Sequence, residues 1–256
     1  MARLANKDEA NAEFRRKYDR VFRRHRAEFI RLLGSPPSAA NVPEAFWEKL
    51  RSEVEAESVS MMILLFIAAA TQSQMVDGDA LRMSQSTAET AAQQYASEQA
   101  GKLANAVVQN TREAARQAFD GAELLKPEVV ARVNSGRILG PSRAASMGTP
   151  EATKAVTAGG EAQIARVERE GVDIVRLWQH QTHRPPGHAN AIVNPCPICS
   201  PLEDRRLETL PPIPTHETGK TLQDGPPAHP WCDCFIEYRF ASPARTNVDK
   251  MAFGEV

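Results

Sequence analysis

The sequence has little of three features that would point to a particular class of protein. Only 6% of its 256 residues are aromatic, it has four cysteines, and its formal net charge is −1. Because the charges balance, the overall electrostatics give no reason to expect nucleic acid as the main partner. Scarce aromatic residues beside abundant alanine favour a helical protein.

The sequence also lacks a long apolar segment. Its longest apolar run, residues 61–70, is shorter than the roughly 20 residues that a helix needs to cross a bilayer. The N-terminus is charged rather than apolar, so no signal peptide is expected. These features favour a protein of a reducing cytoplasm with no membrane partner, where disulfides are disfavoured.

Residues 8–33 carry the clearest periodic pattern. Apolar side chains recur at steps of three and four, which predicts one long amphipathic helix with a packed His25 in its apolar stripe. Its other faces are basic. They form a candidate surface for nucleic acid or an acidic partner, made of Arg15, Arg16, Arg20, Arg23 and Arg24. The alternative is a solvated face partly paired with Glu13, Asp19 and Glu28.

Further helices are predicted along the rest of the N-terminal region. Patterns at 43–67, 86–119 and 127–133 are helical, and the second has a stripe of small residues that lets a neighbour approach closely. Residues 1–136 are therefore expected to form a helical region. A Gly-, Ser- and Pro-rich stretch at 137–148 predicts a linker and a domain boundary.

Residues 149–241 are expected to form a separate module, followed by a mobile tail at 242–256. A helix over 150–170 would take Thr149 as its N-cap and kink or break at Gly159-Gly160. Alternating patterns at 172–178 and 235–240 predict two strands. The expected fold is mainly α, with long N-terminal helices and a small C-terminal α+β module whose short antiparallel sheet carries a Cys/His cluster.

All four cysteines lie within that module. Cys196 and Cys199 form a C-x2-C pair, and the others end the run His229-Pro230-Trp231-Cys232-Asp233-Cys234. Thiolate and imidazole are the ligands that a tetrahedral zinc prefers, and C-x2-C lets one turn of backbone present two sulfurs to one ion. We expect a structural zinc site with Cys196, Cys199 and His229, and one of Cys232 and Cys234 as the fourth ligand.

Other states of the cysteines fit the same spacing. Four cysteines suffice for two disulfides, and a thiol that is not a ligand behaves as a small buried hydrophobe. A catalytic zinc is a third state, involving His180, His183 and His188 and a base such as Glu203 or Asp204. Those histidines lie in a Pro- and Gly-rich stretch, which is typical of exposed loop residues. The sequence has no phosphate-binding glycine loop or nucleophile elbow.

The segment from Trp178 to Cys234 resembles the C-terminal module of the Mu F-like minor head proteins of tailed phages. The resemblance rests on Trp178, on Cys196-Pro197-Ile198-Cys199 with Pro201-Leu202-Glu203 behind it, and on Pro226-Pro227-Ala228-His229-Pro230-Trp231-Cys232-Asp233-Cys234. With the helix upstream, it covers about the last 110 residues. Asp233 stands where the family usually has a basic residue, and Pro150 where its helix usually starts Arg-Thr-Glu.

That resemblance implies a structural protein and not an enzyme. The expected role is head morphogenesis inside the phage head, after assembly in the host cytoplasm. The implied partners are the portal protein and other head or inner capsid proteins, with a nonspecific contact to packaged DNA. The alternative is a metal-dependent hydrolase or nuclease that uses the Cys/His cluster.

Overall fold

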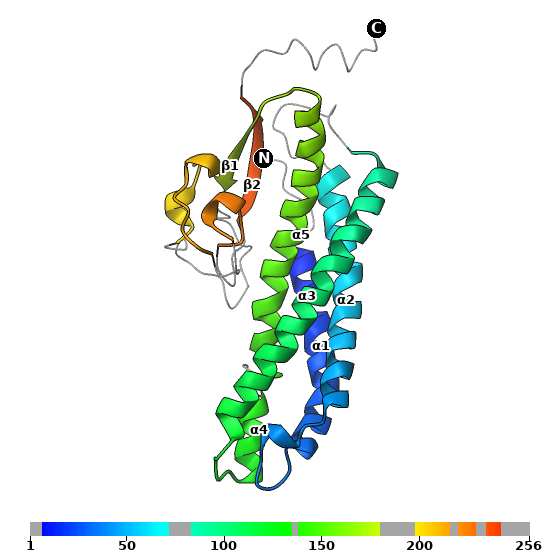
Figure 1. Cartoon of the computed structure of the whole chain (residues 1–256), viewed down its shortest axis with the longest axis vertical. Coiled ribbons are helices and arrows are strands. Elements are labelled where there is room, and N and C mark those ends of the chain that lie inside the picture. The colour runs from blue at the N-terminus through cyan, green and yellow to red at the C-terminus, as the bar shows by residue number, and fades with distance from the viewer. Residues whose placement is uncertain are drawn as a thin grey trace. The chain divides into compact units, whose positions relative to one another are not determined.

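The computed structural model of the protein describes residues 7–71, 83–134, 138–179, 198–215, 220–228 and 234–241. Within these ranges the chain is mainly helical and carries one small antiparallel sheet, as the sequence predicts (Figure 1). In chain order the helices and strands are α1 (Lys7–Leu33), α2 (Glu44–Thr71), α3 (Gln85–Phe119), α4 (Lys126–Asn134), α5 (Pro141–Arg169), β1 (Ile174–Gln179) and β2 (Phe235–Phe240).

The chain forms two compact units whose boundary does not follow the predicted linker. One, here called the helical unit, contains residues 8–63 and 93–152. The other, here called the sheet-bearing unit, contains residues 64–92 and 153–256 together with 1–7. Each unit is therefore assembled from separate stretches of chain, and the divisions fall inside α2, α3 and α5 and after the first residue of α1 rather than in a loop.

The prediction of a linker at 137–148 is wrong for residues 141–148, which form the first turns of α5. Pro141 suits the first helical position, where its missing N–H has no helical partner to lose. Ala144 is buried, and a Cβ on Gly148 would lie 3.2 Å from side-chain atoms of Phe14 and Arg15 in α1. The small residues that suggested a loop instead allow close helix packing.

The same helix overturns two further expectations. Thr149 is not an N-cap, because α5 already includes it, and Pro150 lies in the helix interior. A proline there removes one backbone N–H, a local cost that the packing of a 29-residue helix outweighs. The helix also runs through Gly159-Gly160 without a break.

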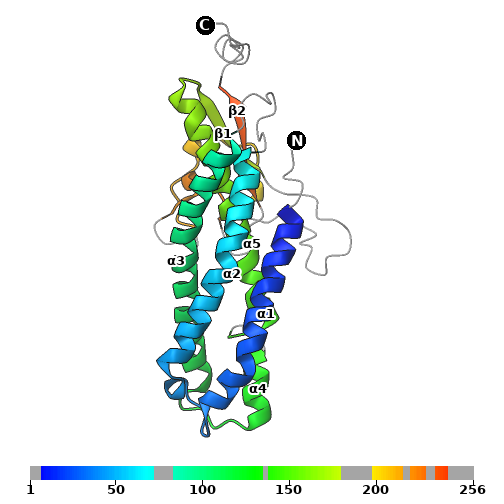
Figure 2. The same ribbon diagram turned by 90° about the vertical axis from the view of Figure 1, so that its right-hand side faces the viewer.

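In the helical unit, α1 lies beside α2 with its apolar stripe inward (Figure 2). Phe14, Tyr18 and Phe22 are completely buried, which confirms the periodic pattern. Ser58 donates to the carbonyl of Val54 at 2.6 Å, so the hydroxyl of Tyr18 is the donor in its 2.8 Å bond to Ser58. Burial raises the pKa of Tyr18, which keeps that donor protonated.

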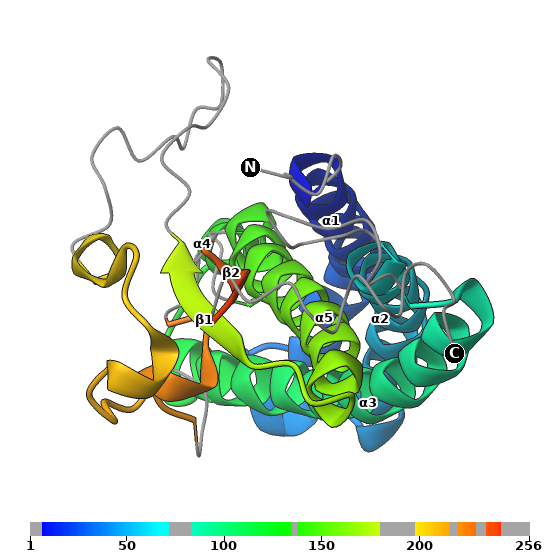
Figure 3. The same ribbon diagram turned by 90° about the horizontal axis from the view of Figure 1, so that it is seen from above.

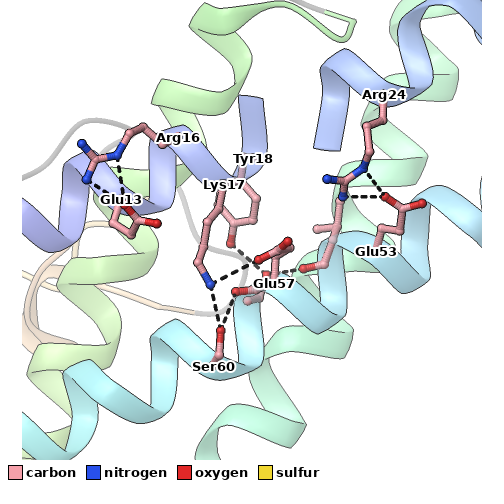
Figure 4. Close-up of polar contacts among 10 residues, drawn as sticks. Glu13, Arg16, Lys17, Tyr18, Arg24, Glu53, Glu57 and Ser60 are labelled. Carbon is pink, nitrogen blue, oxygen red and sulfur yellow. Dashed lines mark hydrogen bonds and ion pairs between the residues drawn. The ribbon is translucent and has the colours of Figure 1, made fainter. Parts of the chain in front are cut away.

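Ion pairs flank this buried contact between α1 and α2 (Figure 4). Lys17 Nζ lies 3.2 Å from a carboxylate oxygen of Glu57 and 3.1 Å from Ser60 Oγ. Further along α1, the guanidinium of Arg24 contacts Glu53 at 2.8 Å. Polar and apolar contacts therefore fix the register of the two helices together.

The small-residue stripe predicted for α3 is present. Side chains four apart lie on one face of a helix, so buried alanines at that spacing form a single narrow ridge. The members of this ridge are Ala88, Ala92, Ala96, Ala100 and Ala104.

By length and composition, α2 is long and apolar enough to cross a membrane. Its most apolar window has a mean hydropathy of 1.6, and 44% of that window is buried inside the protein. Met62 and Phe66 are among the buried side chains, whereas Leu64 is 63% exposed. The burial expected for residues 61–70 is therefore met in part, because six of these ten residues are buried, three are partly buried and Leu64 is exposed.

In the sheet-bearing unit, β1 and β2 pair antiparallel, with Ile174 opposite Phe240 and Gln179 opposite Phe235. Residues after the C-x2-C pair add to the sheet on the β1 side, where Arg206 forms a bridge with Leu177. The described part of this connection between the strands forms short turns at Ser200–Leu202, Leu207–Thr209 and Leu222–Asp224, on the side of the strands that Figure 3 shows in yellow and orange. The described part of the long connection between the strands is thus attached to the sheet.

Candidate metal centre and basic helix face

The five predicted metal ligands lie only partly within the described structure. Cys199 and Cys234 are described, whereas Cys196, His229 and Cys232 are outside the described residues. Cys199 directly precedes a short turn at Ser200–Leu202, and Cys234 directly precedes β2. The structure therefore shows one cysteine from each half of the predicted metal site, Cys199 from the C-x2-C pair and Cys234 from the run before β2.

Both described cysteines belong to one hydrophobic cluster, here called the cysteine core. Cys199 is 1% exposed and Cys234 is 2% exposed. The cluster also includes Trp178 from β1, Leu202 from the short turn, and side chains of β2 and α5, namely Ile236, Tyr238, Ile164 and Val167. The fold thus brings residues from both ends of the predicted metal loop into the same core.

Backbone hydrogen bonds hold the Cys199 end of the loop against β1. The amide of Trp178 donates to the carbonyl of Arg205 at 2.9 Å, and the amide of Asp204 donates to the carbonyl of Trp178 at 2.9 Å. Gln179 adds a side-chain bond of 2.9 Å to a carboxylate oxygen of Asp204. These bonds fix the chain just after the C-x2-C pair.

The Cys234 end is shaped by a tight turn before it. Thr221 and Asp224 form a capping box, and the backbone N–H of Thr221 lowers the pKa of the Asp224 carboxyl. Gly225 follows with a φ of 84°, a conformation that favours glycine, and a Cβ there would lie 2.9 Å from Ile236 Cδ1. The turn therefore packs directly on β2, and Cys234, Ile236 and Tyr238 alternate inward along that strand.

One buried donor of the cysteine core has no acceptor among the residues that the structure describes. Trp178 is completely buried, and its indole Nε1 has no hydrogen-bond partner. Most buried polar atoms in folded proteins are hydrogen-bonded. A metal-bound thiolate is a negatively charged acceptor, so a donor of this kind in the same core is compatible with sulfurs that carry charge.

The donor set of the core fits a metal such as zinc in type but is incomplete within the described residues. Among the residues that the structure describes, no group of three or more His, Cys, Asp or Glu side chains is placed to hold an ion. The two buried sulfurs are soft ligands of the kind that zinc prefers. The other two ligands of a four-coordinate ion would have to come from Cys196, His229 and Cys232.

Sequence reasoning missed a charged cluster that joins α5 to the sheet. The guanidinium of Arg176 on β1 lies 3.0 Å from Glu161 and 2.7 Å from Glu168. Tyr238 on β2 donates its hydroxyl proton to Glu161 at 3.1 Å. A signal was available, because Glu161 and Glu168 are seven residues apart and lie on one helix face.

The electrostatics of this cluster follow from its geometry. Hydrogen bonds from Arg176 lower the pKa of Glu168, and the bond to Glu168 raises the pKa of Arg176. Burial raises the pKa of Tyr238, so its hydroxyl stays protonated and remains a donor. The cluster therefore acts as a charged clamp between α5 and the two strands that support the cysteine core.

Replacing Arg176 with methionine tests this clamp. The aliphatic stem is kept while both ion pairs are lost, and we expect the free energy of unfolding to fall by about 1–2 kcal/mol, because the Arg176 side chain is only 24% exposed. Arg16→Met is the matched control. Arg16 is 66% exposed in its pair with Glu13, so its loss should cost less than about 0.5 kcal/mol. Equal urea midpoints for the two variants would contradict the clamp.

The basic face of α1 is partly neutralised by neighbouring carboxylates. Arg16 pairs with Glu13, and Arg23 pairs with Asp19. Arg24 pairs across to α2 through Glu53, an ion pair that the sequence did not predict. These contacts match the paired, solvated face that was the alternative to a binding surface.

The other two arginines of the candidate surface differ from each other. Arg15 is partly buried and packs beside Gly148 of α5. Arg20 is exposed and makes no ion pair with another described residue. The candidate surface is therefore not one continuous basic patch of unpaired charges.

Most residues of the alternative catalytic zinc site are not among the described residues. His180, His183 and His188 lie outside the described residues. Asp204, one candidate base, accepts a hydrogen bond from Gln179 and has a φ of 55°. Its carboxylate is thus engaged in holding the loop to β1.

Comparisons with known proteins leave the family open. No protein-family model matches the sequence, and neither a curated protein nor a solved structure matches it significantly.

Proposed function

We propose that this protein is a structural component of a tailed-phage head whose sheet-bearing unit is closed by a structural zinc ion. In this role it acts by binding the portal protein or other head proteins, and it performs no catalysis. It would work inside the virion, after assembly in the host cytoplasm, with packaged DNA as a nonspecific neighbour.

One observation carries the proposal. Five residues of the motif that resembles the Mu F-like module meet in one buried core, namely Trp178, Cys199, Leu202, Ala228 and Cys234. They come from β1, from the connection between the strands and from the residue just before β2, so the motif is a set of tertiary neighbours rather than a run of local sequence. A shared core is what a folding module requires.

A zinc ion would add to the contacts that hold this loop. Between the strands the described chain forms only short turns, which contribute Leu202, Leu207 and Leu222 to the cysteine core. Metal binding to such a segment contributes directly to its folding free energy. The residues that would hold the ion are Cys199 and Cys234 with two of Cys196, His229 and Cys232.

Intact-mass spectrometry on protein purified without chelator tests the metal. We expect a native mass higher by one zinc, which is lost when the protein is denatured. A denatured mass lower by about four hydrogens, with no bound metal, would show two disulfides instead and contradict the proposal. A metal-free mass with four intact thiols would also contradict it, because the sulfurs would then only pack.

Binding to the portal protein tests the proposed role. The full-length protein is expected to co-purify with portal protein expressed from the same phage genome, and the zinc-loaded form should be the one retained. Hydrolysis of DNA by the zinc-loaded protein, without portal binding, would favour the hydrolase alternative. Arg20→Ala and Arg23→Ala should leave portal binding unchanged if the exposed face of α1 is only solvated.

A further inference from the structure

His25 is a buried titratable group in the helical unit that the proposed function does not use. Its side chain is 1% exposed, and it lies on the face of α1 that packs against α2. Phe46 approaches its ring edge-on at 5.4 Å and an angle of 85°. Phe29 and Trp47 in turn pack against Phe46, so the imidazole stands at the edge of an aromatic cluster.

The two ring nitrogens of His25 lack good hydrogen-bond partners among the described residues. Neither Nδ1 nor Nε2 makes a hydrogen bond of normal geometry, although Nε2 lies 3.2 Å from a carboxylate oxygen of Glu53. That carboxylate is already held by Arg24, whose guanidinium donates to its other oxygen at 2.8 Å and 3.1 Å. Glu53 is therefore shared, and His25 does not have a counter-charge of its own.

The environment of His25 contains both acidic and basic groups, so it does not strongly stabilise a charged imidazole. Burial lowers the pKa of His25, and the attraction of Glu53 only partly opposes it. Burial by itself would raise the pKa of Glu53, but the bonds from Arg24 and the nearby His25 lower it. The charged groups that face His25 are Arg24 and Glu28 from α1 and Lys49 and Glu53 from α2, with Arg112 of α3 on the ring of Trp47.

We propose that His25 is an acid-sensitive latch, which holds α1 on α2 while it is neutral and lets α1 separate when it takes up a proton. In the closed state a neutral imidazole fills an aromatic site at little electrostatic cost. In the opened state the ring is in water and accepts a proton freely. Acid therefore favours the opened state.

The direction of the effect follows from proton linkage. A histidine whose pKa is lower in the closed state leaves stability unchanged above its ordinary value of about 6.5. Below that pH the opened state binds the proton and the closed state does not, so the opening equilibrium shifts by up to about tenfold per pH unit. Below the lowered pKa of His25 the closed state binds the proton too, and the opening equilibrium stops changing with pH. The pKa of Glu53 is also lowered, so its carboxylate loses its charge only at a pH below this window.

Hydrogen exchange of the full-length protein at pH 7.5 and pH 5.5 tests the latch. After correction for intrinsic exchange rates, amides of α1 that face α2 should lose up to about tenfold in protection at the lower pH. His25→Phe keeps an aromatic ring and removes the titration, so its protection should change less than twofold. His183→Gln is the matched control and should behave like the wild type.

Three results would overturn the proposal. Protection in α1 that stays constant or rises toward pH 5.5 would show that Glu53 stabilises a charged imidazole. The same loss in His25→Phe as in the wild type would assign the effect to another group. The ring proton of His25 in the wild-type protein gives a readout that needs no variant, and an NMR titration midpoint at or above pH 6.5 would also overturn it.

Discussion

Removing the sulfur of Cys199 is expected to cost the sheet-bearing unit several kcal/mol of folding free energy, and that loss should depend on metal. Cys199 is 1% exposed and shares its core with Cys234 and Trp178. If the sulfurs hold zinc, Cys199→Ala removes a ligand, and structural zinc sites supply roughly 10 kcal/mol of apparent binding energy. Wild-type protein treated with a chelator should then unfold at nearly the same urea concentration as the variant.

A cavity effect is separated from a metal effect by two comparisons. Cys199→Ala should be insensitive to chelator, whereas the wild type should lose most of its excess stability. Leu202→Ala is the matched control from the same core, because it removes apolar volume and no ligand. It should cost about 2–4 kcal/mol while the chelator still destabilises it. If chelator has no effect on the wild type, the two sulfurs act only as packed apolar atoms.

Replacing Gly159 by alanine is expected to destabilise the sheet-bearing unit by about 1–3 kcal/mol, even though alanine is the better helix former. A Cβ at Gly159 would lie 2.4 Å from the carbonyl oxygen of Phe66 and 2.9 Å from the Cβ of Ala69. Both atoms belong to α2, and one is backbone, so neither is able to rotate away. The helices would have to separate to accept one methyl group.

Gly101 provides the same substitution with the opposite expected sign. It lies in α3 within the helical unit, where an added Cβ would lie 3.6 Å from the Glu55 carboxylate, an ordinary contact. Gly101→Ala should therefore raise the free energy of unfolding by about 0.5–1 kcal/mol through helix propensity alone. Urea unfolding of both variants checks this. Equal stabilisation by the two substitutions would contradict the close contact of Gly159 with α2.

For the candidate metal site, the sequence predicts the kind of ligand but not where the ligands lie. The spacing of Cys196, Cys199, His229, Cys232 and Cys234 indicates soft ligands for one ion, and the structure adds that Cys199 and Cys234 are buried in one core. The ion pairs that neutralise arginines of α1 could be predicted only in part. Pairs within α1, such as Arg16 with Glu13, follow from helical spacing, whereas Arg24 with Glu53 depends on the packing of a second helix.

The sequence by itself determined the long helices and the two strands. Periodic apolar positions identify α1, α2, α3 and α4, and alternation identifies β1 and β2, because each pattern is repeated locally many times. The start of α5 was decided by tertiary structure. Residues 141–148 have the composition of a loop, and they are helical because their small side chains pack against α1.

Tertiary structure alone also decided how the chain divides and what joins its parts. The divisions between the two compact units fall inside helices, so no local composition marks them. The clamp of Arg176 with Glu161 and Glu168 likewise forms only when β1 lies along α5. The physical reason is the same in each case. Local sequence sets backbone preference, whereas burial and charge pairing depend on residues that are distant in the chain and become neighbours only on folding.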